Sequence, residues 1–383
     1  MKYLVLLCDG MSDYKVQELD NKTPLEYANT PNFDELAKTA KVGVIKTVDE
    51  DMSPGSDIAN LAILGYNPKK YYTGRSPLEA GSIGIDMSPT DVSLRCNLIT
   101  IENGIMKDYS GGDISTNDAK ILIEKLKKEF DNDDFTLYSG VAYRHCLIWN
   151  NGILDGLNLT PPHNITDKEF AEYLPKNEKL LDLTKRSWDI LKGEKANSIW
   201  LWGEGKRAEL DDFEKKYGLK GSMISAVDLL KGIGKFANMN VVDVDKATGY
   251  IDTNFAGKAN AAIEQWKNGQ DLVYIHVEAP DECGHRGEIA NKSKSIELID
   301  KQILEPILAW LKENNLDYKI LITPDHATPL VLKTHTRDAV PFLVYNSTKT
   351  YEGVTPFNED MAKSTGLLIE PGYTIMQEFI NSF

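Results

Sequence analysis

The sequence predicts an α/β fold in which helices flank a central β-sheet and a smaller α+β domain is inserted. Three short apolar runs, at 2–8, 272–277 and 318–323, are rich in β-branched or aromatic residues and end at turn residues, as buried strands do. An amphipathic pattern at 292–315 separates the last two runs, which is the order of a strand–helix–strand unit. Between residues 87 and 195 the pattern changes to hairpins and a surface helix, which indicates the inserted domain.

The chain opens on the strand KYLVLLC (2–8), which passes directly into Asp9 and a glycine. An aspartate followed by glycine after a strand often forms only a turn. Asp9 is nevertheless a candidate ligand, because the later strands end in the same way. A loop and a helix starting near Thr30 or Asn32 follow, and the run VGVIKTV (42–48) predicts a second strand.

The next segment places Ser56 after Pro-Gly and directly before the apolar helical pattern IANLAIL (58–64). A serine at this position is often only a helix N-cap. The functional interpretation is a nucleophile over a helix N-terminus, where backbone amides and the helix dipole favour a phosphate. Arg75, in the glycine-rich loop YYTGRSPLEAG, is a candidate clamp for a phosphate or carboxylate, with a solvated surface arginine as the alternative.

The inserted domain is expected to contain a hairpin turning at 102–104, an amphipathic helix at 118–130 and two strands within 135–151. A helical stretch at 168–195, interrupted by proline, leads back to the core. Arg144 lies in the strand AYRHCLIW. It could reach a substrate from the insertion, or it could have only a cross-strand or surface role.

The core resumes with the strand SIWLW, which ends in Gly-Glu-Gly before Lys206 and Arg207. These two cations are candidates for contact with an anionic substrate. A loop that contains Lys246 then leads into a helix that contains Lys258. The remaining core segments are a strand and helix at 222–239, a strand at 341–347 and a closing helix at 374–383.

Metal-competent side chains follow the strands at 272–277 and 318–323, in the motifs DECGH, PDH and HTRDAVPF. These side chains are Asp281, His285, Asp325, His326 and His335. Strand ends of an open α/β sheet are where ligands bind, so we expect these residues at one sheet edge. Carboxylate oxygens with imidazole nitrogens suit Zn²⁺, Mn²⁺ or Fe²⁺ better than Ca²⁺. Two such ions, roughly 3.5–4 Å apart, can clamp a phosphoryl group. Any one of these histidines alone would more often be an ordinary core or surface residue.

The composition of the chain argues against several classes of protein, among them nucleic-acid-binding, disulfide-rich and membrane-spanning proteins. With 383 residues, 42% hydrophobic and 26% charged, the chain is an ordinary globular protein of one large or two moderate domains. Its net charge of −15 argues against binding to a nucleic-acid backbone. Four cysteines without CxxC spacing indicate neither a disulfide framework nor a structural zinc site. The first apolar run is too short for a signal peptide, and no run approaches the roughly 20 residues of a membrane span, so we expect a cytoplasmic protein.

Taken together, Asp9, the PGSD motif around Ser56 and the three metal motifs resemble the alkaline phosphatase superfamily. More narrowly, the chain resembles the archaeal type of cofactor-independent phosphoglycerate mutases over nearly its full length. The resemblance extends to LGYNPKKYYTGRSPLEA, RCNLITI, SAVDLLKGIG and ATGYIDTNFAGK. It implies an alkaline-phosphatase-like core formed by 1–86 and 196–383, and a cap domain at 87–195 that closes over the substrate.

The resemblance also implies a division of the site residues. One metal would be held by Asp281, His285 and His335. The other would be held by Asp9, Asp325 and His326, with Ser56 as both ligand and nucleophile. Mn²⁺ is the expected metal, with Zn²⁺, Mg²⁺ or Co²⁺ as alternatives. The four residues expected to hold the anionic substrate are Arg75, Arg144, Arg207 and Lys246. For the active-site lysine that the family implies, Lys258 is the competing choice.

The implied reaction is the interconversion of 3-phosphoglycerate and 2-phosphoglycerate through a phosphoserine at Ser56. A sister group with the same motifs is proposed to act as homoserine kinases, so a kinase is an alternative. The chain has no GxxxxGK[ST] loop that would indicate a nucleotide site. A phosphatase or phosphodiesterase on the same metals is a third possibility. A non-catalytic metal-binding or scaffold protein is a fourth, although all seven ligand and nucleophile positions are filled.

Overall fold

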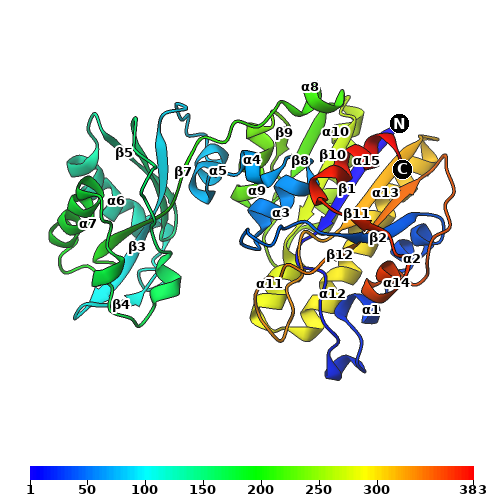
Figure 1. Cartoon of the computed structure of the whole chain (residues 1–383), viewed down its shortest axis with the longest axis horizontal. Helices are drawn as coiled ribbons and strands as arrows, with labels where there is room; N and C mark the ends of the chain where they lie inside the picture. Colours follow the sequence, from blue (N-terminus) through cyan, green and yellow to red (C-terminus); the bar gives the residue numbers. More distant parts are fainter. The chain divides into compact units, whose positions relative to one another are not determined.

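A computed structural model describes residues 1–383 and divides the chain into two compact units (Figure 1). The first unit, which we call the core unit, contains residues 1–72 and 210–383. The inserted unit, residues 73–209, begins before and ends after the predicted insertion of 87–195. It is longer because helix α5 (Arg75–Ser82) and strand β7 (Ser198–Lys206) both pack against β3 (Val92–Glu102) of the inserted sheet.

An eight-stranded sheet forms the centre of the core unit, in the order β13-β2-β12-β11-β1-β10-β8-β9. Strand β1 (Lys2–Cys8) lies between β10 (Leu272–Val277) and β11 (Tyr318–Thr323), and both pairings are parallel. The outer strands are β2 (Lys41–Ile45), β8 (Gly221–Ile224), β9 (Asn240–Val242), β12 (Val340–Asn346) and β13 (Leu368–Ile369). Every residue of β10 and β11 is buried, as expected for central strands of a mixed sheet covered on both faces. The predicted α/β fold is confirmed.

The helices of the core unit cover this sheet. They are α1 (Pro24–Tyr27), α2 (Pro31–Ala37), α3 (Ser56–Ile63), α4 (Pro68–Tyr71), α8 (Phe213–Tyr217), α9 (Asp228–Phe236), α10 (Phe255–Lys267), α11 (Ala279–Arg286), α12 (Ile289–Ile299), α13 (Glu305–Glu313), α14 (Glu359–Ser364) and α15 (Ile375–Asn381). The single helix predicted at 292–315 is instead α12 and α13 joined by a π-helical turn, Asp300–Leu304. Asp300 in that turn accepts the Phe33 backbone N–H (2.8 Å) at the start of α2. A tertiary contact of this kind leaves no mark on the amphipathic pattern.

The inserted unit contains a five-stranded sheet, with β4-β3-β6-β5 in order and β7 paired to the other side of β3. Its remaining strands are β4 (Ile105–Asp108), β5 (Phe135–Val141) and β6 (Arg144–Trp149). The predicted hairpin between β3 and β4 is confirmed, as is the surface helix, now α6 (Thr116–Phe130). On β3, Leu94, Cys96 and Leu98 join the core that also contains residues of α6 and of α7 (Glu178–Ile190).

None of the helices combines the length and the apolar character needed to cross a bilayer. All four cysteines are buried free thiols.

Candidate active site

The candidate site lies where three neighbouring parallel strands of the core unit end. Asp9 directly follows β1, Asp281 is the fourth residue after β10, and Asp325 is the second residue after β11. Because these strands are parallel and adjacent, their carboxyl ends meet at one edge of the sheet. The structure therefore brings Asp9 together with two carboxylates that lie more than 250 positions later in the sequence.

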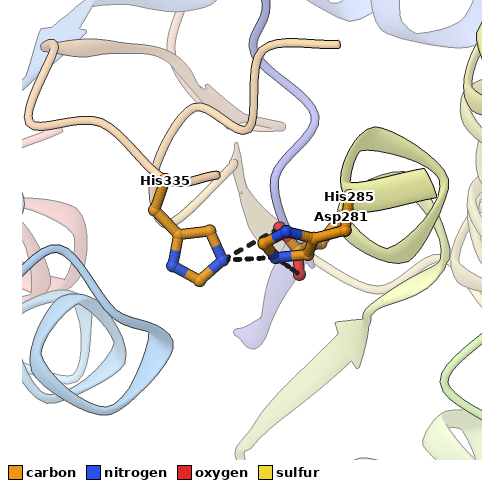
Figure 2. A group of neighbouring side chains, drawn as sticks. All are labelled: Asp281, His285 and His335. Atoms are coloured by element: carbon orange, nitrogen blue, oxygen red, sulfur yellow. Dashed lines mark hydrogen bonds and ion pairs between the residues drawn. The ribbon is translucent and has the colours of Figure 1, made fainter. Parts of the chain in front are cut away.

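One cluster combines Asp281, His285 and His335 (Figure 2). Asp281 and His285 lie one turn apart on α11, so both side chains project from the same helix face. His335 comes from the loop after β11. The Asp281 carboxylate oxygens lie 3.2 Å from Nε2 of His285 and 3.3 Å from Nε2 of His335, and the two Nε2 atoms are 2.8 Å apart.

The other ring nitrogen of each histidine is already occupied. Nδ1 of His285 donates to the Lys333 carbonyl at 2.9 Å, and Nδ1 of His335 donates to the Pro54 carbonyl at 3.1 Å. A carbonyl can only accept, so Nδ1 carries a proton in both rings, and Nε2 is the nitrogen that faces the cluster and would bind a cation in place of a proton. Metal-bound histidines are usually held by this type of second hydrogen bond.

The second cluster combines Asp9, Asp325 and His326, all buried. Nε2 of His326 lies 3.3 Å from Asp325 Oδ2 and 3.7 Å from Asp9 Oδ1. Asp9 Oδ1 is buried and has no hydrogen-bond partner. An orphaned carboxylate oxygen of this kind is costly unless a cation or a polar group meets it.

Ser56 is the first residue of α3 and is preceded by Gly55 as the N-cap. Because Gly55 occupies the N-cap position, the alternative interpretation of Ser56 as the capping residue is wrong. Instead, Ser56 Oγ lies 3.2 Å from His326 Nε2, the same nitrogen that faces Asp325 and Asp9. The hydroxyl thus stands beside the second cluster and over the N-terminus of an eight-residue helix.

The pKa shifts of the carboxyl and imidazole groups show that both clusters have a negative electrostatic environment, which favours a cation. Hydrogen bonding to Asp281 raises the pKa of His285 to about 9. Although burial opposes it, hydrogen bonds from His285 and His335 hold the pKa of Asp281 well below its usual range. Burial, followed by the negative charges of Asp325 and Asp281, raises the pKa of Asp9 well above its usual range. A cation would relieve the repulsion among these carboxylates.

The donor set fits two divalent metal ions. Each cluster offers carboxylate oxygens and imidazole nitrogen on converging atoms, which suits Mn²⁺, Zn²⁺ or Co²⁺. The division of the six residues into these two groups is the division that the resemblance implied.

Several buried residues around the clusters were not singled out in the sequence. His276 on β10 binds Asp9 Oδ2 through Nε2 at 2.7 Å. Asn60 donates to Asp325 Oδ2 (3.0 Å) and to the Ser56 carbonyl (2.8 Å), and its own oxygen accepts from the Tyr274 hydroxyl (2.6 Å). His276 and Tyr274 lie in the otherwise apolar strand β10. Their polar side-chain atoms in an apolar run were the only sequence signal that they support the site.

The four expected substrate-binding residues divide between the units. Arg75, Arg144 and Arg207 belong to the inserted unit, and Lys246 to the core unit. Arg75 Nε donates to Glu79 (2.8 Å), Arg207 donates to the Met87 carbonyl (3.2 Å), and Arg144 is exposed at the start of β6. Lys246 is exposed, with φ of 58°.

Two further cations were given too little weight in the sequence. Arg95 on β3 is buried; its Nε is 3.0 Å from Glu79, and its guanidinium lies 4.2 Å from the centre of the Trp202 ring. The alternation of polar Ser93, Arg95 and Asn97 on this strand was the available signal. Lys258 is also buried; its ammonium donates to the His276 carbonyl at 2.7 Å, and burial lowers its pKa to about 8.

Comparison with known proteins gives a consistent result. A family model described as 2,3-bisphosphoglycerate-independent phosphoglycerate mutase matches residues 37–197. A protein of that name from Methanosarcina barkeri is 47% identical over 96% of both chains. A probable enzyme of the same name from Geobacter sulfurreducens is 45% identical over the full length of both.

Solved structures agree in fold. A protein from Pyrococcus horikoshii is 27% identical, with a TM-score of 0.82 over 99% of this chain and 97% of its own. The cofactor-independent phosphoglycerate mutase from Thermoplasma acidophilum is 25% identical, with a TM-score of 0.68 over 99% of each chain.

Proposed function

Because the chain belongs to the family of 2,3-bisphosphoglycerate-independent phosphoglycerate mutases, we propose that it interconverts 3-phosphoglycerate and 2-phosphoglycerate at the site formed by Ser56 and the two Asp/His clusters. One observation carries the proposal. The Ser56 hydroxyl stands 3.2 Å from His326 Nε2, at a helix N-terminus and beside converging carboxylates. This arrangement supports a nucleophile that faces a phosphoryl group.

The proposal includes two divalent metal ions, with Mn²⁺ as the first candidate and Zn²⁺, Mg²⁺ or Co²⁺ as alternatives. Asp281, His285 and His335 would hold one ion. Asp9, Asp325 and His326, with Ser56, would hold the other. When bound, the ions supply Lewis acidity that stabilises negative charge on the phosphoryl and serine oxygens.

The bond changes are balanced within one substrate molecule. The Ser56 hydroxyl loses its proton, and its oxygen forms a bond to phosphorus while the bond between phosphorus and the C3 oxygen of the substrate breaks. That oxygen takes a proton, and the resulting glycerate stays bound. The C2 hydroxyl then loses a proton and takes the phosphoryl group from Ser56, which regains its hydroxyl. Nothing is oxidised or reduced, and no second phosphorylated compound is needed.

The chain's own side chains orient the partners. Asn60 ties the first turn of α3 to Asp325, so the nucleophile and a metal ligand keep a constant spacing. Lys258 supports β10 next to Asp9 through the His276 carbonyl.

Anion binding completes the proposal. Arg75, Arg144 and Arg207 would supply positive charge to the substrate from the inserted unit, and Lys246 from the core unit. The shared contact of Arg75 and Arg95 with Glu79 makes Arg95 a further candidate. A cytoplasmic location is part of the proposal, because a multiply charged phosphorylated acid does not cross a bilayer unaided.

The test is an enolase-coupled assay with 3-phosphoglycerate and Mn²⁺, without 2,3-bisphosphoglycerate. We expect turnover that EDTA abolishes and that the Ser56→Ala variant lacks, while the Ser53→Ala variant, altered at an exposed serine nearby, retains it. Turnover by Ser56→Ala equal to wild type would refute the role of Ser56. Absence of turnover by folded, Mn²⁺-loaded wild type, together with phosphate transfer from ATP to homoserine, would replace the mutase by a kinase.

A further inference from the structure

Thr328 is a buried threonine that contacts both candidate metal clusters. It lies two residues after His326 in the loop that follows β11, and its side chain is fully buried. Its hydroxyl donates a short hydrogen bond to Asp281 Oδ1, in the first cluster. The same oxygen lies 3.3 Å from Nδ1 of His326, in the second cluster.

The direction of these two hydrogen bonds follows from the number of protons. A hydroxyl has one proton, and a carboxylate can only accept, so the Thr328 proton goes to Asp281. The contact with His326 can then form only if Nδ1 of the imidazole is the donor. Nε2 of His326, which faces Asp9, Asp325 and Ser56, is therefore the nitrogen left with a lone pair.

A buried ion pair holds the backbone that directly follows the Thr328 side chain. The Lys292 ammonium, on α12, donates to the Thr328 carbonyl at 2.8 Å and to Asp13 Oδ2 at 2.6 Å. Asp13 in turn accepts the Leu330 backbone N–H at 3.1 Å. The side chain of Lys292 is completely buried and that of Asp13 is 1% exposed.

The loop that carries Thr328 is also bound to the loop that follows β1. The Thr328 backbone N–H donates to the Ser12 carbonyl at 3.2 Å. Moving the loop would break these contacts and weaken the pairing of buried polar and charged groups, which is energetically costly. The contacts therefore hold the Thr328 hydroxyl in one position.

We propose that Thr328 is a positioning residue that couples the two metal sites, and that Lys292 and Asp13 hold it in place. The inference rests on the proposed function, because it requires both clusters to bind a cation. Loss of the hydroxyl removes a donor from Asp281 and an acceptor from His326. Both sites therefore weaken together, although only one atom changes and that atom belongs to neither ligand set.

Matched variants isolate the hydroxyl. Thr328→Val removes it at nearly the same volume, and Thr328→Ser keeps it while removing the methyl group. We expect Mn²⁺ titration of the chelator-treated protein by calorimetry to give two sites in wild type. Affinity at both sites should fall about 10- to 100-fold in Thr328→Val, as for other groups that orient metal ligands, and stay near wild type in Thr328→Ser. Thr328→Ala is a second hydroxyl-free variant if the valine protein does not fold.

A role in packing alone predicts different results. It would lower the unfolding midpoint of the chelator-treated variants without changing their Mn²⁺ affinity. Wild-type affinity in Thr328→Val, weakening at only one site, or equal weakening in Thr328→Ser would overturn the inference and leave the proposed site intact. If folded wild type bound no Mn²⁺ at all, the proposed metal sites would fail, and the coupling with them.

Discussion

Gly10, in the loop after β1, packs closely against Asp281 and Thr328. Its replacement by alanine therefore tests the packing of these residues in the candidate site. The residue has φ of +60°, and an added Cβ would lie 2.6 Å from both Asp281 Oδ1 and Thr328 Oγ1, and 2.7 Å from the Asp281 Cα. The last of these is backbone, so the contact cannot be relieved by a side-chain rotation alone.

Two costs add in the Gly10→Ala variant. The left-handed backbone conformation costs an alanine about 1–2 kcal/mol. Forcing a methyl group into a packed site costs about 1–3 kcal/mol more. We therefore expect a loss of about 2–5 kcal/mol in the free energy of unfolding. Because Asp281 must move, Mn²⁺ affinity should also fall.

Gly218 provides the matched control. It has φ of +69° in the same unit, but its added Cβ would have no atom within 4 Å. Gly218→Ala should therefore show only the backbone cost of about 1–2 kcal/mol and should keep wild-type Mn²⁺ affinity. Urea unfolding in EDTA and Mn²⁺ calorimetry measure the two effects. Equal stability losses in both variants, with unchanged metal affinity in Gly10→Ala, would refute the packing described for this site.

Two further predictions concern hydrogen bonding and pH. Tyr274→Phe leaves the Asn60 oxygen unpaired in the core and frees the amide to rotate, so it should cost about 1–3 kcal/mol in urea unfolding and lower Mn²⁺ affinity. Mn²⁺ affinity equal to wild type would show that Asn60 does not need this partner. Burial lowers the pKa of His145 to about 4, so its neutral form contributes stability above pH 6.5 that is lost as the pH falls toward 4. The stability advantage of wild type over His145→Asn should shrink by up to about 3 kcal/mol between pH 7 and 4, and a constant difference would contradict the shift.

Much of the site could be predicted because its ligands follow a simple rule. Asp9, Asp281 and Asp325 each come soon after a continuous apolar run, and parallel strands place such residues at one edge. The helix that begins at Ser56 could also be predicted, from the helical spacing of its apolar residues. These features depend on the local sequence and on the general geometry of α/β sheets.

The supporting residues could not be predicted in this way. Lys292 appears in the sequence as one more lysine of an amphipathic helix, yet it is completely buried against Asp13. Its role depends on a partner 279 positions away, which no local pattern reveals. Thr328 and Asn60 likewise lie in segments whose local sequence gives no sign of their contacts with the site. The limits of the inserted unit differ from the predicted 87–195 for a related reason, since helix α5 packs on β3 and β7, which follow it in the chain.

The position of β1 has a consequence for synthesis of the protein. Both of its partners, β10 and β11, lie at residue 272 or later, and β2 pairs only with β12 and β13. All strand pairs of the inserted unit, in contrast, lie within residues 73–209. On the ribosome, the second unit in the sequence is therefore the first that can fold. The apolar strand at the N-terminus must wait on the order of tens of seconds, at about 5–20 residues per second, before a partner emerges. Chaperone dependence should be concentrated in this interval.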